Sequence, residues 1–391
     1  MTLGAVSEVT SRLLSELIIR NGPVPFSVAM DVALYSPGGF YAAGGGAGRR
    51  RDFITSPEVG ALFGAVLANA LDSRWQALGR PDPFIVAEVG AGPGMLARTV
   101  LEAEPRCGEA LRYIMVDRSE AMRALHSEHL SLTSADELLG RSAAAGLDSD
   151  EDARIIPGQG PLVASMAALP AHRFRGVIVA NELLDNLAFD LLERQPDRWV
   201  EVRITNAADG TAQELLVPSA PDLSEWAEAI APDAPFGGRI PRQRQAWEWV
   251  QSARLSLEAG TVMVVDYCVE STAALSERDP AEWLRTYRAH GRGRHPFEDI
   301  GSQDITVDVA IDQLPRCTRM SSQADALGRW GISTLVAEAR ATWHERASIG
   351  DLAALQARSR VQEAEALTDL TGLGSFTVME WDVGRIASVQ P

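Results

Sequence analysis

Short apolar runs alternate with longer segments of helical periodicity from residue 84 onward. The runs are FIVAEVG (84–90), YIMVD (113–117), GVIVAN (176–181) and TVMVVDY (261–267). Strands of this kind, separated by helices, are typical of a parallel sheet that is covered on both faces. Two later runs, DITVDVAI (304–311) and SFTVMEWD (375–382), could complete the sheet. The pattern therefore predicts an α/β fold.

The segment before this sheet, residues 1–83, is predicted to be mostly helical. Amphipathic runs at about 5–20 and 25–35 are separated by NGPVP, whose glycine and prolines interrupt a helix. Serine as N-cap and proline at N1 favour helix initiation. A long helix is therefore predicted to begin at Ser56 and to continue through about Leu78.

Four stretches interrupt the alternation of strands and helices. Residues 198–218 alternate in character around Asp209-Gly210, which predicts a β-hairpin. Residues 280–303 are polar, basic and irregular. Segments 42–52 and 141–153 are rich in small and charged residues, and we expect a mobile loop and a surface linker there.

The charge balance narrows the classes of partner. Acidic residues outnumber basic ones 53 to 36, which gives a formal net charge of −17. Such a balance disfavours nonspecific binding to nucleic acid or to an anionic membrane, and it suits a basic partner or a small ligand. All 36 basic residues are arginines, so lysine-based catalysis is excluded.

The cysteines and histidines indicate neither a disulfide framework nor a metal site. The three cysteines are scattered without a CxxC pair, and no two histidines have HExxH spacing. The N-terminus lacks the pattern of a signal peptide, and no stretch approaches transmembrane length. We therefore predict no bound metal, no membrane insertion and a cytoplasmic location.

A glycine-rich turn joins the first apolar run to the following helix. Gly90, Gly92 and Gly94 let the backbone turn tightly and approach a ligand beside the helix N-terminus. Their spacing is GxGxG, whereas dinucleotide-binding folds use GxGxxG. An acid before the turn, Glu88, suits a cationic ligand better than a diphosphate, and the proline within the turn removes a backbone N–H that a phosphate would use.

A second acid follows at the end of the next apolar run. Asp117 stands 23 residues after Gly94, where a carboxylate accepts hydrogen bonds from ribose hydroxyls in nucleotide-binding sheets. Together with Glu88 and the glycine turn, it resembles the S-adenosylmethionine (SAM) site of class I methyltransferases. The alternative is a tight strand–helix turn in another α/β protein, and an oxidoreductase is disfavoured by the glycine spacing.

A third polar group follows GVIVAN in the stretch NELLDN (181–186). Asn181 could cap a helix whose dipole favours Glu182 and Asp185 in the first turn. On a helix, however, those two acids would also share one face, and ligands of open α/β sheets bind outside the carboxyl ends of strands. Two carboxylates beside a methyl donor would suit a guanidinium and could orient its nitrogen. We therefore predict that Asn181, Glu182 and Asp185 are catalytic.

These motifs, in this order, resemble the MidA-like family of SAM-dependent methyltransferases, which includes the mitochondrial protein-arginine methyltransferase needed for respiratory complex I assembly. The resemblance extends over roughly 25 to 380. It is carried by FSVAMDVALYSPGGFY (26–41), RDFITSPEVGALFGAVLANAL (51–71), AEVGAGPGMLART (87–99), VANELLDNLAFD (179–190), VVDY (264–267), LRTYRAHGRGRHPFEDIGSQDIT (284–306) and SFTVME (375–380).

The resemblance implies a class I, Rossmann-like methyltransferase fold with a helical N-terminal region and insertions that form a substrate-facing lobe. The expected division is a helical cap at 1–83 and a methyltransferase core at 84–391, with inserts at about 191–254 and 280–303. Asn181, Glu182 and Asp185 would face the substrate. The expected cofactor-binding residues are Thr55, Ser56, Pro57, Glu58, Glu88, Gly90, Gly92, Gly94, Asp117 and Asn181.

The resemblance further implies SAM as cofactor, S-adenosylhomocysteine (SAH) as product and arginine in a respiratory complex subunit as acceptor. Three departures from the family pattern concern the acceptor side. Leu187-Ala188-Phe189 replaces a Pro-Val-His type segment, Cys268 replaces a glycine, and Val307-Asp308 replaces Ala-His. Two alternatives therefore stay open: a non-catalytic assembly factor that retains the fold, and a small-molecule methyltransferase. The sequence also leaves the oligomeric state open, and a homodimer is one candidate.

Overall fold

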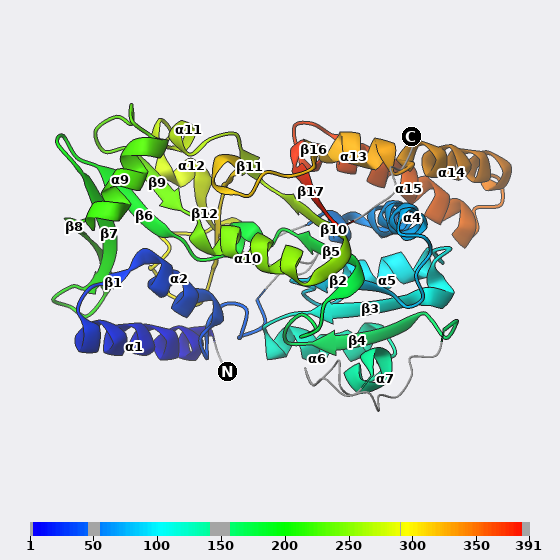
Figure 1. Ribbon diagram of the computed structural model, residues 1–391, viewed down its shortest axis with the longest axis horizontal. Helices are drawn as coiled ribbons and strands as arrows, with labels where there is room; N and C mark the ends of the chain where they lie inside the picture. The colour runs from blue at the N-terminus through cyan, green and yellow to red at the C-terminus, as the bar shows by residue number, and fades with distance from the viewer. Residues whose placement is uncertain (1–2, 46–54, 141–156, 290, 385–391) are drawn as a thin grey trace. The chain divides into compact units, whose positions relative to one another are not determined.

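The computed structural model describes residues 3–45, 55–140, 157–289 and 291–384 (Figure 1). The chain forms two compact units, each made of segments that alternate along the sequence. Unit 1 comprises Met1–Phe53, Leu183–Gln251 and Tyr267–Pro315, and unit 2 comprises Ile54–Glu182, Ser252–Asp266 and Arg316–Pro391. The predicted linker 141–153 and most of the predicted loop 42–52 lie outside the described residues.

Unit 2 is built around a seven-stranded sheet with the strand order β16-β17-β10-β5-β2-β3-β4 (Figure 1). Its strands are β2 (Phe84–Val89), β3 (Leu111–Val116), β4 (Leu162–Met166), β5 (Phe174–Asn181), β10 (Leu257–Asp266), β16 (Arg319–Ser322) and β17 (Thr377–Val383). Neighbouring strands from β4 to β10 are parallel, whereas β17 is antiparallel to β10 and to β16. The predicted mainly parallel α/β sheet is confirmed.

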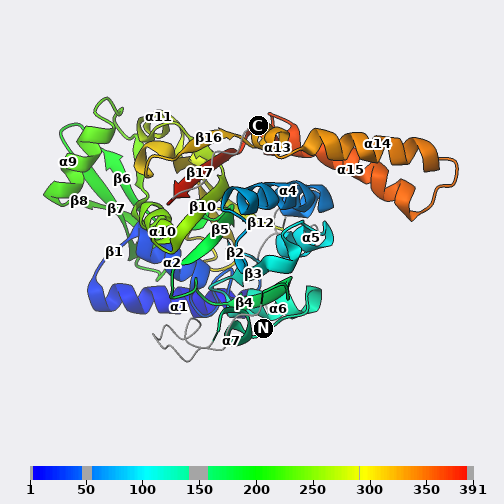
Figure 2. The same cartoon turned by 45° about the vertical axis from the view of Figure 1, so that its right-hand side comes forward.

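Helices cover this sheet because its central strands are apolar on both faces. Val177, Ile178, Val179 and Ala180 of β5 are at most 2% exposed. The helices of unit 2 are α3 (Ser56–Val59), α4 (Ala61–Ala77), α5 (Met95–Glu102), α6 (Glu120–His129), α7 (Ala135–Leu139), α13 (Gln323–Arg329), α14 (Ile332–Arg346) and α15 (Leu352–Thr368). Helices α14 and α15 pack side by side (Figure 2).

The strand order reverses between β2 and β5, which gives unit 2 a topological switch point. The chain proceeds from β2 to β3 and β4 on one side, and from β5 to β10 on the other. Val89 of β2 pairs with Ala180 of β5, so the two strands end at the same edge of the sheet. Open α/β sheets bind ligands outside the carboxyl ends of strands at such a point. The glycine turn begins at this point, after β2, and Asn181 is the last residue of β5.

Unit 1 contains smaller sheets. Strands β1 (Val24–Pro25), β6 (Asp190–Arg194), β7 (Trp199–Asn206), β8 (Ala212–Pro218) and β9 (Arg239–Arg242) form one sheet; β12 (Leu284–Arg288), β13 (Gly291–Arg292) and β14 (Asp304–Val307) form another; β11 (Cys268–Val269) pairs with β15 (Val309–Ala310). The helices are α1 (Leu3–Asn21), α2 (Phe26–Tyr35), α9 (Pro221–Ile230), α11 (Thr272–Ser276) and α12 (Pro280–Trp283), and α10 (Arg244–Leu255) crosses the unit boundary.

The predicted helices near the N-terminus and the predicted β7–β8 hairpin are confirmed. The strand predicted at 304–311 is wrong in its partners. It forms β14 and β15, which pair with β12 and β11 of unit 1 and do not extend the sheet of unit 2. An alternating apolar pattern predicts a strand but does not determine its partner, because pairing depends on residues distant in sequence.

The long helix predicted from Ser56 is interrupted. Helix α3 ends at Val59, Gly60 follows, and α4 begins at Ala61, while the N-cap is Thr55. A Cβ atom on Gly60 would lie 2.1 Å from the side-chain carboxyl carbon of Glu363, whose Oε2 accepts the Leu62 N–H at 2.9 Å. A carboxylate from α15 thus caps α4, which no local signal in the sequence indicates.

Candidate functional site

The glycine turn leads from β2 into α5 at the switch point of unit 2. Gly90, Gly92 and Gly94 have φ values of 74°, 53° and 88°, in the left-handed region that favours glycine. A Cβ atom on Gly92 would meet no heavy atom within 4 Å. The Gly90 N–H donates to the Val116 carbonyl at 2.9 Å, which links the turn to β3. Gly92, in the middle of the turn, therefore presents bare backbone toward open space.

The backbone of Gly92 is held on both sides. Asp117 accepts the Gly92 N–H through Oδ2 at 2.9 Å and the Ser119 N–H through Oδ1 at 2.8 Å. Nε2 of His126 lies 2.9 Å from the Gly92 carbonyl oxygen. Burial raises the pKa of Asp117, and the two backbone hydrogen bonds oppose that rise. Asp117 therefore orders the turn, and each carboxylate oxygen keeps a lone pair for a further donor.

Glu88 lies beneath the turn, inside unit 2. Glu88 is 4% exposed, and its Oε2 accepts a hydrogen bond from the Tyr113 hydroxyl at 2.8 Å. Burial raises the pKa of Glu88 to about 8, although the hydrogen bonds from Tyr113 and from the Ala97 backbone oppose this rise. Glu88 is therefore mainly neutral at pH 7, and these contacts tie β2 to β3 and to the first turn of α5.

Asn181 ends β5 and contacts the residue that follows it. Its Nδ2 donates to Oε1 of Glu182 at 3.0 Å, while its Oδ1 is buried and has no hydrogen-bond partner among the described residues. Glu182 has a φ of 52°, and its N–H donates to the Val265 carbonyl at 2.8 Å. The backbone thus extends its pairing with β10 past the end of β5 and then turns through a left-handed residue.

The helix predicted for this stretch is therefore wrong. Asn181 belongs to a strand and caps no helix, and Glu182 and Asp185 do not share a helical face. After Glu182 the stretch forms one 3₁₀ turn, η2 (Leu184–Asn186), which belongs to unit 1. The backbone of Glu182 pairs with β10 instead of starting a helix that Asn181 would cap. Pairing with a distant strand here outweighs the local preference of NELLDN for a helix start.

Asp185 belongs to a group in unit 1 that we call the acidic cluster: the buried Asp185, Asn186 and Asp304, and the half-buried Tyr41. The Tyr41 hydroxyl lies 3.0 Å from Oδ1 of Asn186 and 3.0 Å from Oδ1 of Asp304. Nδ2 of Asn186 donates to that same Asp304 oxygen at 3.1 Å. Burial, and the nearby charges of Asp304 and Asp185, raise the pKa of Tyr41 well above its usual value. Sequence reasoning missed Tyr41 and Asp304, which lie far from Asp185 in the chain.

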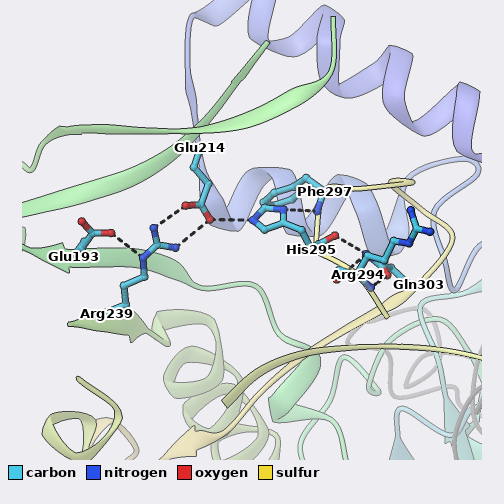
Figure 3. A network of polar contacts seen from close by, with 7 residues as sticks. All are labelled: Glu193, Glu214, Arg239, Arg294, His295, Phe297 and Gln303. Carbon is cyan, nitrogen blue, oxygen red and sulfur yellow. Dashed lines mark hydrogen bonds and ion pairs between the residues drawn. The ribbon is translucent and has the colours of Figure 1, made fainter. Parts of the chain in front are cut away.

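A polar network holds the loop that precedes Asp304 (Figure 3). Two nitrogens of Arg239 donate to the carboxylate of Glu214, at 3.1 and 2.7 Å, and Nε2 of His295 lies 3.2 Å from the same group. Burial raises the pKa of Glu214, but the hydrogen bonds from His295 and Arg239 outweigh it and lower the pKa to about 2. The buried Gln303 amide donates to the His295 carbonyl at 2.7 Å. The loop is thus tied to strands β8 and β9.

The four residues expected to border the cofactor begin helix α3. Thr55 is the N-cap, and Ser56 and Pro57 are buried. The Ser56 hydroxyl donates to Oε1 of Gln323 at 3.0 Å, so it is used within unit 2. Glu58 lies in the first turn of α3, where its N–H donates to the Thr55 carbonyl at 2.9 Å. Their proximity to a cofactor stays a prediction.

Two of the departures from the family pattern are accommodated by packing and charge. Phe189, where the family has histidine, is 1% exposed and its ring stacks on Phe26 at 5.2 Å. Asp308 accepts hydrogen bonds or ion pairs from Arg278 at 3.0 Å and from Arg285 at 2.6 Å. The changed residues therefore have partners within unit 1.

Metal ligation and membrane insertion find no support in the described part of the chain. Its histidine, cysteine and acidic side chains include no group of three or more arranged to hold a metal ion. None of its helices combines the length and the apolar character that crossing a membrane requires.

The strand order, the glycine turn at the switch point and the acid that ends β3 define an α/β protein of the nucleoside-binding type. Residues 66–329 match the model of a family described as "Putative S-adenosyl-L-methionine-dependent methyltransferase". The chain belongs to this family, the MidA-like SAM-dependent methyltransferases. The expected methyltransferase fold is thereby confirmed.

Solved structures agree with this assignment. A COG1565 superfamily member from Burkholderia thailandensis, crystallised with S-adenosyl-homocysteine, is 28% identical with a TM-score of 0.80, over 99% of this chain and 94% of that chain. A native crystal structure of a COG1565 superfamily protein from the same organism is 27% identical with a TM-score of 0.78, over 99% of this chain and 95% of that chain.

Curated relatives are named protein arginine methyltransferase NDUFAF7, mitochondrial. The Drosophila melanogaster homolog is 26% identical over 75% of this chain and 66% of the relative, and the human protein is 25% identical over 76% and 66%. The chain thus spans just under two thirds of the length of these relatives. Their mitochondrial names contradict the cytoplasmic location predicted from the sequence, which is wrong on this comparison. Absence of a signal peptide did not test for a mitochondrial location.

Proposed function

We propose that the protein transfers a methyl group from SAM to an arginine side chain of a protein. The observation that carries the proposal is the switch point of unit 2, where the paired residues Val89 and Ala180 lead into the open backbone at Gly92 and into a buried, unsatisfied acceptor on Asn181. Membership of a SAM-dependent family and the likeness to a structure crystallised with SAH both support SAM as the cofactor.

The residues at the switch point fit SAM chemically. The Oδ1 of Asn181 requires a donor, because a buried acceptor without a partner costs about 1–3 kcal/mol, and SAM carries amino groups that donate. Asp117 has lone pairs available for ribose hydroxyls. Gly92 gives a ligand room to approach the backbone closely. We also propose that Glu88 and residues 55–58 belong to the cofactor site, as the sequence predicts.

When bound, SAM would supply a methyl group on a sulfonium sulfur, and its transfer to a guanidinium nitrogen forms a C–N bond, breaks the C–S bond and releases one proton. We assign Glu182 and Asp185 as the candidate acids that accept guanidinium N–H donors through charge-assisted hydrogen bonds and take the released proton. Asn181 orients Glu182 through the hydrogen bond from Nδ2.

The acceptor is proposed from the relatives and from charge. The curated relatives are named protein arginine methyltransferases. A net charge of −17 attracts a basic segment, in which arginines are common. An arginine in a basic segment of a respiratory complex I subunit is therefore the acceptor to test first.

Calorimetry with SAM and SAH tests the cofactor half of the proposal. The folded protein should bind both, and Asp117→Asn should bind SAH more weakly because it loses a charged acceptor. Asp197→Asn, an exposed acid, is the matched control and should bind as the wild type does. Folded wild-type protein that binds neither compound refutes this half.

Transfer of a labelled methyl group from SAM to purified complex I subunits tests the acceptor half. Glu182→Gln and Asp185→Asn should lose transfer by at least about 100-fold while they retain SAH binding. Label on a small molecule and none on protein would favour a small-molecule methyltransferase. SAH binding without transfer, together with complex assembly that survives both substitutions, would favour a non-catalytic assembly factor.

A further inference from the structure

We propose that His126 is a positioning residue that holds the glycine turn in the conformation required to bind SAM, a role that rests on the proposed function. His126 lies on α6 and is 0% exposed. No motif in the sequence marks it, because a histidine on an amphipathic helix is typical of an ordinary core residue.

The ring of His126 connects the turn to the edge strand β4. Nε2 lies 2.9 Å from the Gly92 carbonyl oxygen, and Nδ1 lies 2.8 Å from the Ser165 hydroxyl on β4. Cδ2 of the ring lies 3.5 Å from the position that a Cβ atom on Gly94 would occupy. One side chain therefore contacts the middle and the last glycine of the turn and a strand two places from β2 in the sheet.

The hydrogen-bonding groups determine the tautomer. A carbonyl oxygen only accepts, so Nε2 of His126 must carry the proton in its contact with Gly92. Nδ1 then accepts from the hydroxyl of Ser165, which can donate. Burial favours the neutral imidazole. All polar atoms of the ring are satisfied in this one arrangement.

The consequence for the turn follows from the freedom of glycine. Gly92 has a φ of 53°, and glycine adopts many other conformations at little cost. Asp117 fixes the peptide plane before Gly92 through its N–H, and His126 fixes the plane after it through the carbonyl. With both planes fixed, the turn is pre-organised, and SAM does not have to order it on binding.

Calorimetry with SAH on the full-length protein tests the role with two substitutions at one position. His126→Leu removes the donor and should weaken SAH binding about tenfold, the equivalent of one lost hydrogen bond. His126→Gln places an amide nitrogen near the Nε2 position and should recover binding to within about threefold. His129→Leu, on the same helix but exposed, is the matched control and should bind as the wild type does.

Amide hydrogen exchange of Gly92, measured without ligand, gives a second readout. Exchange should be faster in His126→Leu than in His126→Gln at equal overall fold, and imidazole ¹⁵N shifts of the wild type should show protonated Nε2. SAH binding and Gly92 exchange that are unchanged in a folded His126→Leu overturn the proposal, as does a wild-type His126 protonated only at Nδ1. If the wild type binds no SAH, the proposed function fails, and the exchange and tautomer still decide whether His126 holds the turn.

Discussion

Replacement of Glu88 by glutamine should make the stability of unit 2 less sensitive to pH. Glu88 is 4% exposed, and burial raises its pKa from 4.5 to about 8 in the folded protein. Glutamine has nearly the same size and still accepts a hydrogen bond from Tyr113, but it does not ionise. The substitution therefore isolates the cost of a buried negative charge beneath the glycine turn.

The sign and size follow from the two pKa values. Between pH 4.5 and about 8 the folded protein keeps a proton on Glu88 that the unfolded chain has lost, so the free energy of unfolding falls as pH rises through this window. Below pH 4.5 the contribution is fully present, and above about pH 8 it is fully lost. Each pH unit is worth about 1.4 kcal/mol, so the loss has an upper limit of about 5 kcal/mol.

Urea unfolding at constant ionic strength, from pH 5 to pH 9, measures this effect. The quantity of interest is the difference in unfolding free energy between Glu88→Gln and the wild type at each pH, because other titrating groups cancel. The variant should gain at least about 2 kcal/mol relative to the wild type between pH 5 and pH 8. A hydrogen bond lost to the amide shifts the whole curve but not its slope. Glu128→Gln, an exposed acid on α6, should show no such slope.

Two results would refute the reasoning. Parallel curves for Glu88→Gln and the wild type would mean that Glu88 titrates as an ordinary carboxyl. A variant that loses stability relative to the wild type as pH rises from about 3 to 5, in an extension of the same series, would mean that the folded pKa of Glu88 lies below 4.5 and that its donors stabilise the charge. That result would support the prediction that this acid offers a charge to a cationic ligand.

Three further substitutions test the site and its support. Gly92→Ala should cost about 1–2 kcal/mol of stability for its left-handed φ and should also weaken SAH binding in calorimetry, whereas Gly79→Ala, equally left-handed and unobstructed, should lose only the stability. Gly60→Ala forces its new Cβ against the Glu363 carboxyl and should lower the urea midpoint by an equivalent of about 1–3 kcal/mol. Tyr41→Phe leaves buried oxygens of the acidic cluster with fewer donors and should cost a similar amount in urea unfolding. An unchanged midpoint in the last two would contradict the contacts described.

The strands of the central sheet were predictable because their signal is local. The apolar runs that became β2, β3, β5 and β10 are buried on both faces, and their short length and β-branched residues favour strands over buried helices. Strand β4 (Leu162–Met166) was missed, since it lies at the sheet edge and mixes apolar with polar residues. The run at 304–311 has the same local pattern as a sheet strand, and only its distant partners exclude it from the sheet of unit 2.

The glycine turn and the acid that follows it were predictable from spacing, but the residues that order them were not. His126 forms a hydrogen bond with Gly92, 34 positions away in the chain, and Glu363 caps α4 by accepting the N–H of Leu62, 301 positions away. Neither has a neighbour in sequence that indicates its role. Likewise, the Glu182 N–H donates to the Val265 carbonyl, and the residue then turns through a left-handed φ; composition alone would identify neither feature.

The two points at which the chain leaves unit 2 suggest how chimaeric proteins could be built. Strands β5 and β10 leave unit 2 immediately after Glu182 and Asp266, and their mutual register, with Val265 opposite Asn181, is fixed before either crossing. Replacing residues 183–251 and 267–315 by the corresponding segments of another family member would keep the same anchor points in unit 2. Such a chimaera would therefore test which unit determines the methyl acceptor.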